Sequence, residues 1–192
     1  MGKKLSEMSL EELWQLFPIF LTGHQACWED WFREEACVLK EALSETKVKQ
    51  ISHIGSTAIE TIWAKPIIDI LVEMSEGSDF EEVKKILLKT GYLFMGGEGC
   101  RLSFNKGYTE EGFAERVFHL HLRYAGDNDE LYFRDYLRNH EETAREYERL
   151  KFRLWEKYEY DRDKYTKAKT EFVERCMKRA KIEREKEERT KA

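Results

Sequence analysis

Apolar positions along the chain follow two different periods, which predict a mixture of helices and strands. Short apolar runs bounded by turn residues are typical of strands, whereas longer runs with helical spacing are typical of helices. The run at 66–74 is almost continuously apolar, as expected for a strand that is buried on both faces. Strands are predicted at 48–54, 66–74, 92–95, 101–105 and 117–124.

Helices are predicted on both sides of these strands. Helical spacing covers residues 26–43, and a second amphipathic run begins after Asp79, a residue type that caps helix starts. Ser9-Leu-Glu-Glu12 has the pattern of a capping box and predicts a further helix. From Asn128 onward no strand pattern remains, and we expect helices that break near residues 139–140 and 160–161.

Together these elements predict an α+β fold, with a mixed sheet, flanking N-terminal helices and a C-terminal helical cap. We expect one compact unit, because 192 residues suit a single domain. Its expected parts are N-terminal helices (1–45), an α/β core (46–126), a helical cap (127–178) and a charged tail that is either helical or frayed (179–192).

Composition narrows the range of partners. The net charge is −5, but residues 151–192 contain 15 Lys and Arg against 10 Asp and Glu, so the rest of the chain is acidic. This distribution does not favour a general nucleic-acid binder. The four cysteines have no metal-binding spacing, and no apolar run is long enough to cross a membrane. We therefore expect a reduced, cytoplasmic protein.

One acidic residue stands out against this background. Asp69 lies within the apolar strand predicted at 66–74, where a buried charge is costly unless a partner or a metal compensates it. Thirteen residues upstream, Gly55-Ser56 follows the apolar strand at 48–54. Such a turn can present backbone N–H groups and a hydroxyl to a phosphate. The two features together indicate a site for a metal-bound phosphate.

Several motifs occur in an order that resembles the GrpB-like family of the polymerase-β-type nucleotidyltransferase superfamily. They are His53-Ile-Gly-Ser-Thr57, Ala64-Lys-Pro-Ile-Ile-Asp-Ile-Leu71, His119-Leu-His121, residues 133–138 with His140, residues 146–151, and Asp161-Arg162, Tyr165-Thr166 and Lys169 before Phe172. The resemblance covers roughly residues 28–176. It implies a nucleotidyltransferase-like fold that uses a nucleoside triphosphate, with Mg²⁺, or in its place Mn²⁺, as cofactor.

The resemblance also implies roles for individual residues. Gly55, Ser56 and Thr57 would hold the phosphates, and Asp69 would ligate the metal, so that Asp69 and Ser56 are the expected catalytic residues. The chain departs from the superfamily two residues after Asp69, where Leu71 replaces a second carboxylate. Glu73, the next residue on the same strand face, would lie about 7 Å further along. This is far for a shared metal, and Glu73 is expected instead to line the cleft.

Cationic residues are candidates for phosphate binding. Lys65 precedes the Asp69 strand, and Arg101 lies at the start of a strand expected nearby. Arg134 and Arg138 are one helical turn apart in the predicted cap, where the resemblance favours contacts with the nucleotide's phosphates. Each could instead be a solvated surface charge.

Three histidines are expected to line the cleft. His53 is either a hydrogen-bonded core histidine or a substrate contact. His119 and His121 project from one face of their strand, at the position where the superfamily places a third carboxylate. They would converge with Asp69 on a transition metal or, if protonated, on a phosphate; the same pattern also fits a solvated polar face.

The sequence therefore predicts a metal-dependent nucleotidyltransferase acting on an acceptor that the sequence does not identify. Two alternatives remain at this point. The loss of a second carboxylate at Leu71 fits a nucleotide- or phosphate-binding module without catalysis, and the histidines fit a His/Asp transition-metal site. A small-molecule nucleotide is the expected partner, with neither nucleic acid nor membrane, and the N-terminal helices are compatible with a homodimer.

Overall fold

The computed structural model describes residues 3–191, apart from the side chains of residues 187 and 191. The chain forms two compact units, each assembled from separate stretches of sequence. The first unit contains residues 1–24, 59–65 and 129–192, and the second contains residues 25–58 and 66–128. The expected parts at 1–45 and 179–192 extend to residues 1, 2 and 192, which lie outside the described residues.

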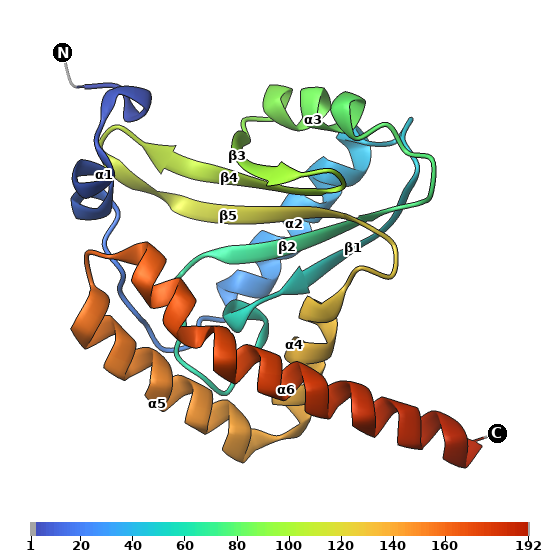
Figure 1. The fold of residues 1–192 in the computed structure, drawn as a ribbon. Helices are drawn as coiled ribbons and strands as arrows, with labels where there is room; N and C mark the ends of the chain where they lie inside the picture. Colours follow the sequence, from blue (N-terminus) through green and yellow to red (C-terminus); the bar gives the residue numbers. More distant parts are fainter. Residues whose placement is uncertain (1–2, 192) are drawn as a thin grey trace. The chain divides into compact units, whose positions relative to one another are not determined.

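The second unit is built on a five-stranded mixed sheet with the strand order β1-β2-β5-β4-β3 (Figure 1). Strands β2 and β5 are parallel, and the other neighbouring pairs are antiparallel. All seven residues of β2 are buried except Asp69, which confirms a strand covered on both faces. The strands are β1 (Val48–Ile54), β2 (Ile68–Met74), β3 (Leu93–Glu98), β4 (Arg101–Thr109) and β5 (Gly112–Tyr124).

Two helices of this unit pack on the sheet. Helix α2 (Cys27–Ala42) contacts β1 and β2 through an apolar stripe that includes Trp28 and Leu39, both fully buried. Helix α3 (Phe80–Lys89) lies against β3 and begins at the predicted cap, because the Asp79 carboxylate accepts hydrogen bonds from the Glu81 and Glu82 backbone N–H groups.

The last strand begins earlier than the sequence pattern predicted. Strand β5 starts at Gly112 rather than Val117, and β4 continues to Thr109, so the two strands form a longer hairpin. The Thr109 hydroxyl closes its turn by donating to the Gly112 carbonyl, 2.8 Å away. The pattern failed here because residues 114–116 are exposed, so the segment lacks the apolar alternation of a buried strand.

The first unit is helical. Its helices are α1 (Leu10–Leu16), α4 (Asp129–Asn139), α5 (Glu141–Tyr158) and α6 (Arg162–Lys191), with breaks where the sequence predicted them. The capping box of α1 is confirmed, since Ser9 and Glu12 bond reciprocally. Buried residues of segment 59–65 and of the C-terminal helices share one core: Ile59, Ile62, Phe133, Tyr136, Leu137, Ala144, Tyr147, Phe172, Cys176 and Ala180.

Among the helices of residues 3–191, none combines the length and the apolar character needed to cross a bilayer.

Candidate functional site

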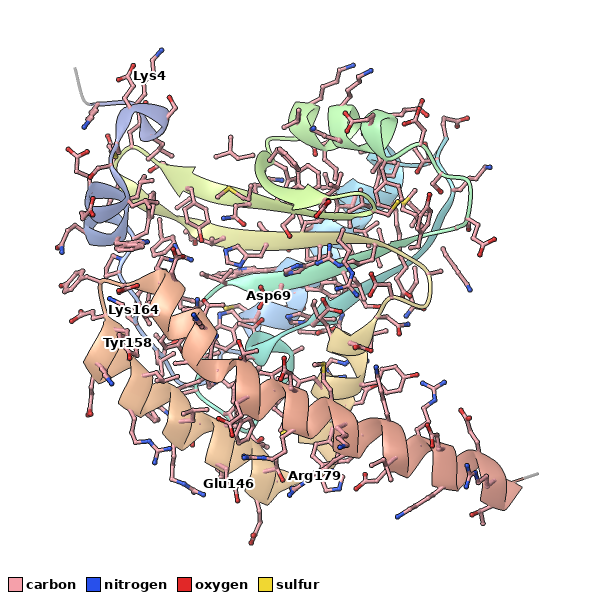
Figure 2. All side chains as sticks on the ribbon, in the orientation of Figure 1. Lys4, Asp69, Glu146, Tyr158, Lys164 and Arg179 are labelled. Carbon is pink, nitrogen blue, oxygen red and sulfur yellow. The ribbon has the colours of Figure 1, made fainter. Side chains whose placement is uncertain are left out.

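The turn after β1 lies directly against Asp69. Ile54, the last residue of β1, is paired with Asp69 on β2, and Asp69 is labelled in Figure 2. Gly55 therefore continues past the Asp69 carboxylate. Gly55 has a φ of 71°, in the left-handed region that favours glycine. A Cβ built there would lie 2.8 Å from Cγ of Asp69 and closer still to Oδ2. The structure therefore brings together the two sequence features that indicated a phosphate site.

Ser56 and Thr57 follow in a single 3₁₀ turn, Ser56–Ala58, but they face different surroundings. The Ser56 side chain is half-buried and makes no hydrogen bond to another described residue, so its hydroxyl can serve a ligand. Thr57 is buried, and its hydroxyl donates to the Ile67 carbonyl, 3.2 Å away. Thr57 therefore fixes the turn, whereas Ser56 is accessible.

His53 is held inside the second unit. Because Thr57 uses its one hydroxyl proton on Ile67, Nε2 of His53 donates to Thr57 Oγ1 over 3.0 Å. The other ring nitrogen lies 3.3 Å from Oε2 of Glu29, and the ring stacks on Phe32 with a centroid separation of 4.8 Å. Of the two roles weighed from sequence, these contacts favour the hydrogen-bonded core histidine.

Asp69 has a histidine as its neighbour on the next strand. Asp69 and His119 are in register on the parallel strands β2 and β5, and His119 Nδ1 lies 3.3 Å from Asp69 Oδ1. On the other side of the ring, Nε2 is 2.7 Å from the Tyr108 hydroxyl. Since the carboxylate accepts from Nδ1–H, the Tyr108 O–H donates to Nε2 of the neutral ring. The result is a hydrogen-bonded chain of Tyr108, His119 and Asp69.

Tyr108 is the member of this chain that the sequence interpretation missed. It lies beyond the strand expected at 101–105. The hairpin pairs His119 with Asn105 and Tyr108 with Phe113, and the Tyr108 hydroxyl reaches His119 from beyond the register shift between Lys106 and Tyr108. The side chains of Asp69 and His119 are 27% and 20% exposed, so both are accessible to a ligand despite their position in the sheet.

His121 lies one row further along the sheet, paired with Leu71 rather than Asp69. Burial lowers the pKa of His121 to about 4, with smaller contributions from Arg123 and His119 and an opposing one from Asp69. His121 is therefore neutral near pH 7 and does not offer the positive charge considered for phosphate binding. Among residues 3–191, no group of three or more His, Cys, Asp or Glu side chains could hold a metal ion, which gives the transition-metal alternative no support.

The second carboxylate of β2 is already engaged. Glu73 is 4% exposed, and its Oε1 accepts hydrogen bonds from the Gly126 backbone N–H and from Asn128 Nδ2, at 3.2 and 3.0 Å. It lies four residues from Asp69, about 13 Å along the strand. Leu71 between them is completely buried. Asp69 is thus the carboxylate of β2 that remains accessible at the turn.

The predicted cationic residues are distributed over both units. Arg101 lies four residues along β4 from Asn105, the partner of His119, and it forms an ion pair with Asp127. The structure therefore does not bring Arg101 to Asp69. In the first unit, Arg134 on α4 is paired with Asp135, and Arg138 is exposed on the same helix. Lys65 belongs to that unit as well.

Comparison with known proteins gives one consistent family. The family model described as GrpB protein matches residues 18–179. The glutamate-rich protein GrpB of Alkalihalophilus pseudofirmus is 35% identical over 165 residues, covering 83% of this chain and 94% of that protein. A UPF0157 protein of Pseudomonas aeruginosa is 38% identical over 156 residues, covering 80% of this chain and 64% of that protein.

A solved structure has the same architecture. The crystal structure of the conserved protein GrpB from Enterococcus faecalis has a TM-score of 0.71 and 32% sequence identity, covering 84% of this chain and 96% of that one. It confirms the predicted α+β class, with N-terminal helices, a five-stranded mixed sheet and C-terminal helices.

Proposed function

The chain belongs to the GrpB protein family, and from that premise we propose that it transfers a nucleotidyl group from a nucleoside triphosphate to an acceptor. The proposal places this chain, as its sequence motifs suggested, in the polymerase-β-type nucleotidyltransferase superfamily. The observation that carries it is the close approach of the Gly55 backbone to the accessible carboxylate of Asp69. Backbone N–H groups and a hydroxyl can bind the phosphate oxygens of a nucleotide, and a neighbouring carboxylate can bind the metal ion that accompanies them.

The donor set fits Mg²⁺ that arrives with the nucleotide. Mg²⁺ prefers oxygen ligands, keeps several waters, and is commonly bound through one or two carboxylates together with substrate phosphates. Asp69 supplies one such carboxylate, and the phosphates of the nucleotide would complete the set. When bound, the ion would neutralise charge that develops on the transferred phosphoryl group.

The protein's own groups would hold the substrate around this carboxylate. Gly55 allows the backbone to approach the phosphates without a side chain in the way, and the Ser56 hydroxyl donates to a phosphate oxygen. The bond from His119 orients the Asp69 carboxylate, and Tyr108 in turn fixes the histidine ring. Each group would then be positioned before the substrate arrives, which lowers the cost of organising the site.

Calorimetry with non-hydrolysable nucleoside triphosphates and Mg²⁺ tests the binding step. Asp69→Asn keeps the shape of the side chain and removes its charge, so we expect it to abolish the part of the affinity that depends on Mg²⁺. Asp30→Asn, an exposed acid on α2, is the matched control and should bind as the wild type does. Absence of heat with all four nucleotides would refute the proposal.

A nucleotide-binding module without catalysis is the second candidate. It is favoured by the buried Leu71 and by the engagement of Glu73 with Gly126 and Asn128, which leave β2 one accessible carboxylate. Release of pyrophosphate separates the two functions. Mg²⁺-dependent binding without pyrophosphate from any nucleotide, in the presence of cell extract as a source of acceptors, would identify the module.

A further inference from the structure

Three arginines line one cavity of the first unit. The cavity has a volume of about 390 Å³ and lies between α5 and α6, with Arg149 and Arg153 of α5 and Arg175 of α6 in its lining. All three side chains are exposed, so their guanidinium groups can be reached from solvent. An anion that enters the cavity therefore meets cationic groups from two helices.

The spacing of the lining residues explains how the two helices form this cavity. On each helix they occupy positions i, i+3, i+4 and i+7 of one face, counted from Glu146 on α5 and from Ala168 on α6. The i+4 members, Leu150 and Phe172, pack with the apolar core of the unit and form the floor. Ala168 contributes only a methyl group, which leaves room between the longer side chains.

The three arginines have no acidic partner within the part of the chain that the structure describes. None of them forms an ion pair or a side-chain hydrogen bond there. Arg145, one helical turn before Arg149, does pair, since it lies 3.8 Å from Glu141 and 3.3 Å from Glu148. Arg149 and Arg153 are one turn apart, and like charges at this spacing repel each other. Their donors are available to an anion, which would also relieve this repulsion.

Arg175 contacts an aromatic ring instead of an acid. Its guanidinium carbon lies 5.0 Å from the centre of the Phe172 ring. Glu171 precedes Arg175 by four residues, a spacing that allows an ion pair on a helix, but the two side chains do not form one. The contact with Phe172 therefore places Arg175 at the floor of the cavity and leaves its N–H groups without a carboxylate acceptor.

We propose that this cavity binds the phosphoryl group of a small molecule. Arginine suits such a ligand, because the planar guanidinium presents its donors in a fork that matches the oxygens of a phosphate. Guanidinium groups from two helices can surround a phosphate, whose oxygens point in several directions, better than a planar carboxylate. The site consists of residues of α5 and α6 and is independent of the nucleotidyl transfer proposed at Asp69.

Two acids in the same lining affect which phosphate binds. Glu146, which is labelled in Figure 2, and Glu171 accompany the three arginines, so the lining has a formal charge of +1. Both acids are exposed, and they repel an inorganic phosphate. They can also accept hydrogen bonds from hydroxyl or amino groups of an organic phosphate. The lining therefore favours a phosphoryl group carried by a polar organic molecule over a free phosphate.

Calorimetric titration of the full chain with pyrophosphate and with ADP, both without divalent metal, tests the proposal. We expect at least one of them to bind, with an affinity at least about tenfold weaker in Arg149→Gln and in Arg153→Gln. Lys167→Gln removes the same charge from an exposed residue of α6 outside the lining, and it should stay within about twofold of the wild type. Because all three side chains are exposed, the variants should remain folded.

Replacing an acid of the lining should have the opposite effect on pyrophosphate. Glu171→Gln removes a repelling charge, so pyrophosphate should bind about threefold more tightly. Tighter binding of ADP than of pyrophosphate in the wild type would assign the phosphoryl group to an organic molecule, and the reverse order would assign it to an inorganic one.

Two results would overturn the proposal. One is the absence of binding by both ligands. The other is an equal loss of affinity in Lys167→Gln and in the arginine variants, because the anion would then respond only to the overall charge of the protein. Asp69→Asn should bind both ligands as the wild type does without metal, so a loss of Mg²⁺-dependent nucleotide binding in that variant concerns only the other site.

Discussion

Asp69 and His119 lie in register on neighbouring parallel strands, with Nδ1 of the histidine 3.3 Å from a carboxylate oxygen. The hydrogen bond orients the Asp69 carboxylate, which lies against the turn that contains Gly55. The same histidine accepts from Tyr108, so a change at either end of the chain is transmitted to the carboxylate. His119, the residue on β5 opposite Asp69, therefore acts on this acid through a hydrogen bond.

Removal of His119 should weaken Mg²⁺–nucleotide binding. Loss of a group that orients a metal ligand typically lowers metal affinity by about 10–100-fold, and we expect His119→Ala to fall in that range. Tyr108→Phe keeps the His119–Asp69 bond and removes only the far partner, so its effect should be smaller. Calorimetry on both variants measures the difference, and His119→Ala that binds as tightly as the wild type would contradict this role.

Gly55→Ala should destabilise the protein and block the site. The left-handed backbone costs about 1–2 kcal/mol for a residue with a Cβ, and here the Cβ would also collide with Asp69. Gly99→Ala is the matched control, because Gly99 has a φ of 58° and open space around the Cβ position. Urea unfolding should show a loss of about 1–2 kcal/mol for Gly99→Ala and a larger loss for Gly55→Ala. Equal losses would show that the carboxylate yields to the methyl group.

His121 should make stability depend on pH in acid. Its pKa is lowered from 6.5 to about 4 by burial, so between these values the unfolded chain binds a proton that the folded chain does not. The contribution of the neutral His121 ring to the free energy of unfolding is complete above pH 6.5. It is lost as the pH falls towards 4, and the free energy of unfolding then falls by at most about 1.4 kcal/mol per pH unit. Unfolding curves of wild type and His121→Gln should therefore converge as the pH falls through this window. If the two proteins instead lost stability in parallel as the pH fell, the pKa of His121 would not be lowered, and the ring would be in contact with water.

The sequence predicted the elements of this fold better than their pairing. Strand β1 occupies the expected residues 48–54. The start of β5 was missed, since exposed positions carry no periodic signal. The site residues differ in the same way. Asp69 and Gly55 could be chosen from residue type, whereas the contact of Tyr108 with His119 depends on the irregular hairpin of β4 and β5, which the local sequence does not predict.

The candidate residues show the same division. The strand pattern predicts that Glu73 lines the cleft, yet it accepts hydrogen bonds from loop residues Gly126 and Asn128, contacts that the local sequence does not encode. Likewise, Lys151 belonged to a charged helix pattern, but its burial depends on segment 59–65, more than 80 positions away, where it bonds to Trp63.

Lys151 should give stability a second pH dependence, in the alkaline range. The pKa of this lysine is lowered from 10.5 to about 7 by burial and by Lys169, with Glu148 opposing. Between these values the unfolded chain holds a proton that the folded chain has released, so the free energy of unfolding should rise with pH, by up to about 1.4 kcal/mol per unit. Lys151→Met should lose this rise, whereas Lys157→Met, exposed on the same helix, should keep it. A rise that persists in Lys151→Met would show that another group releases the proton.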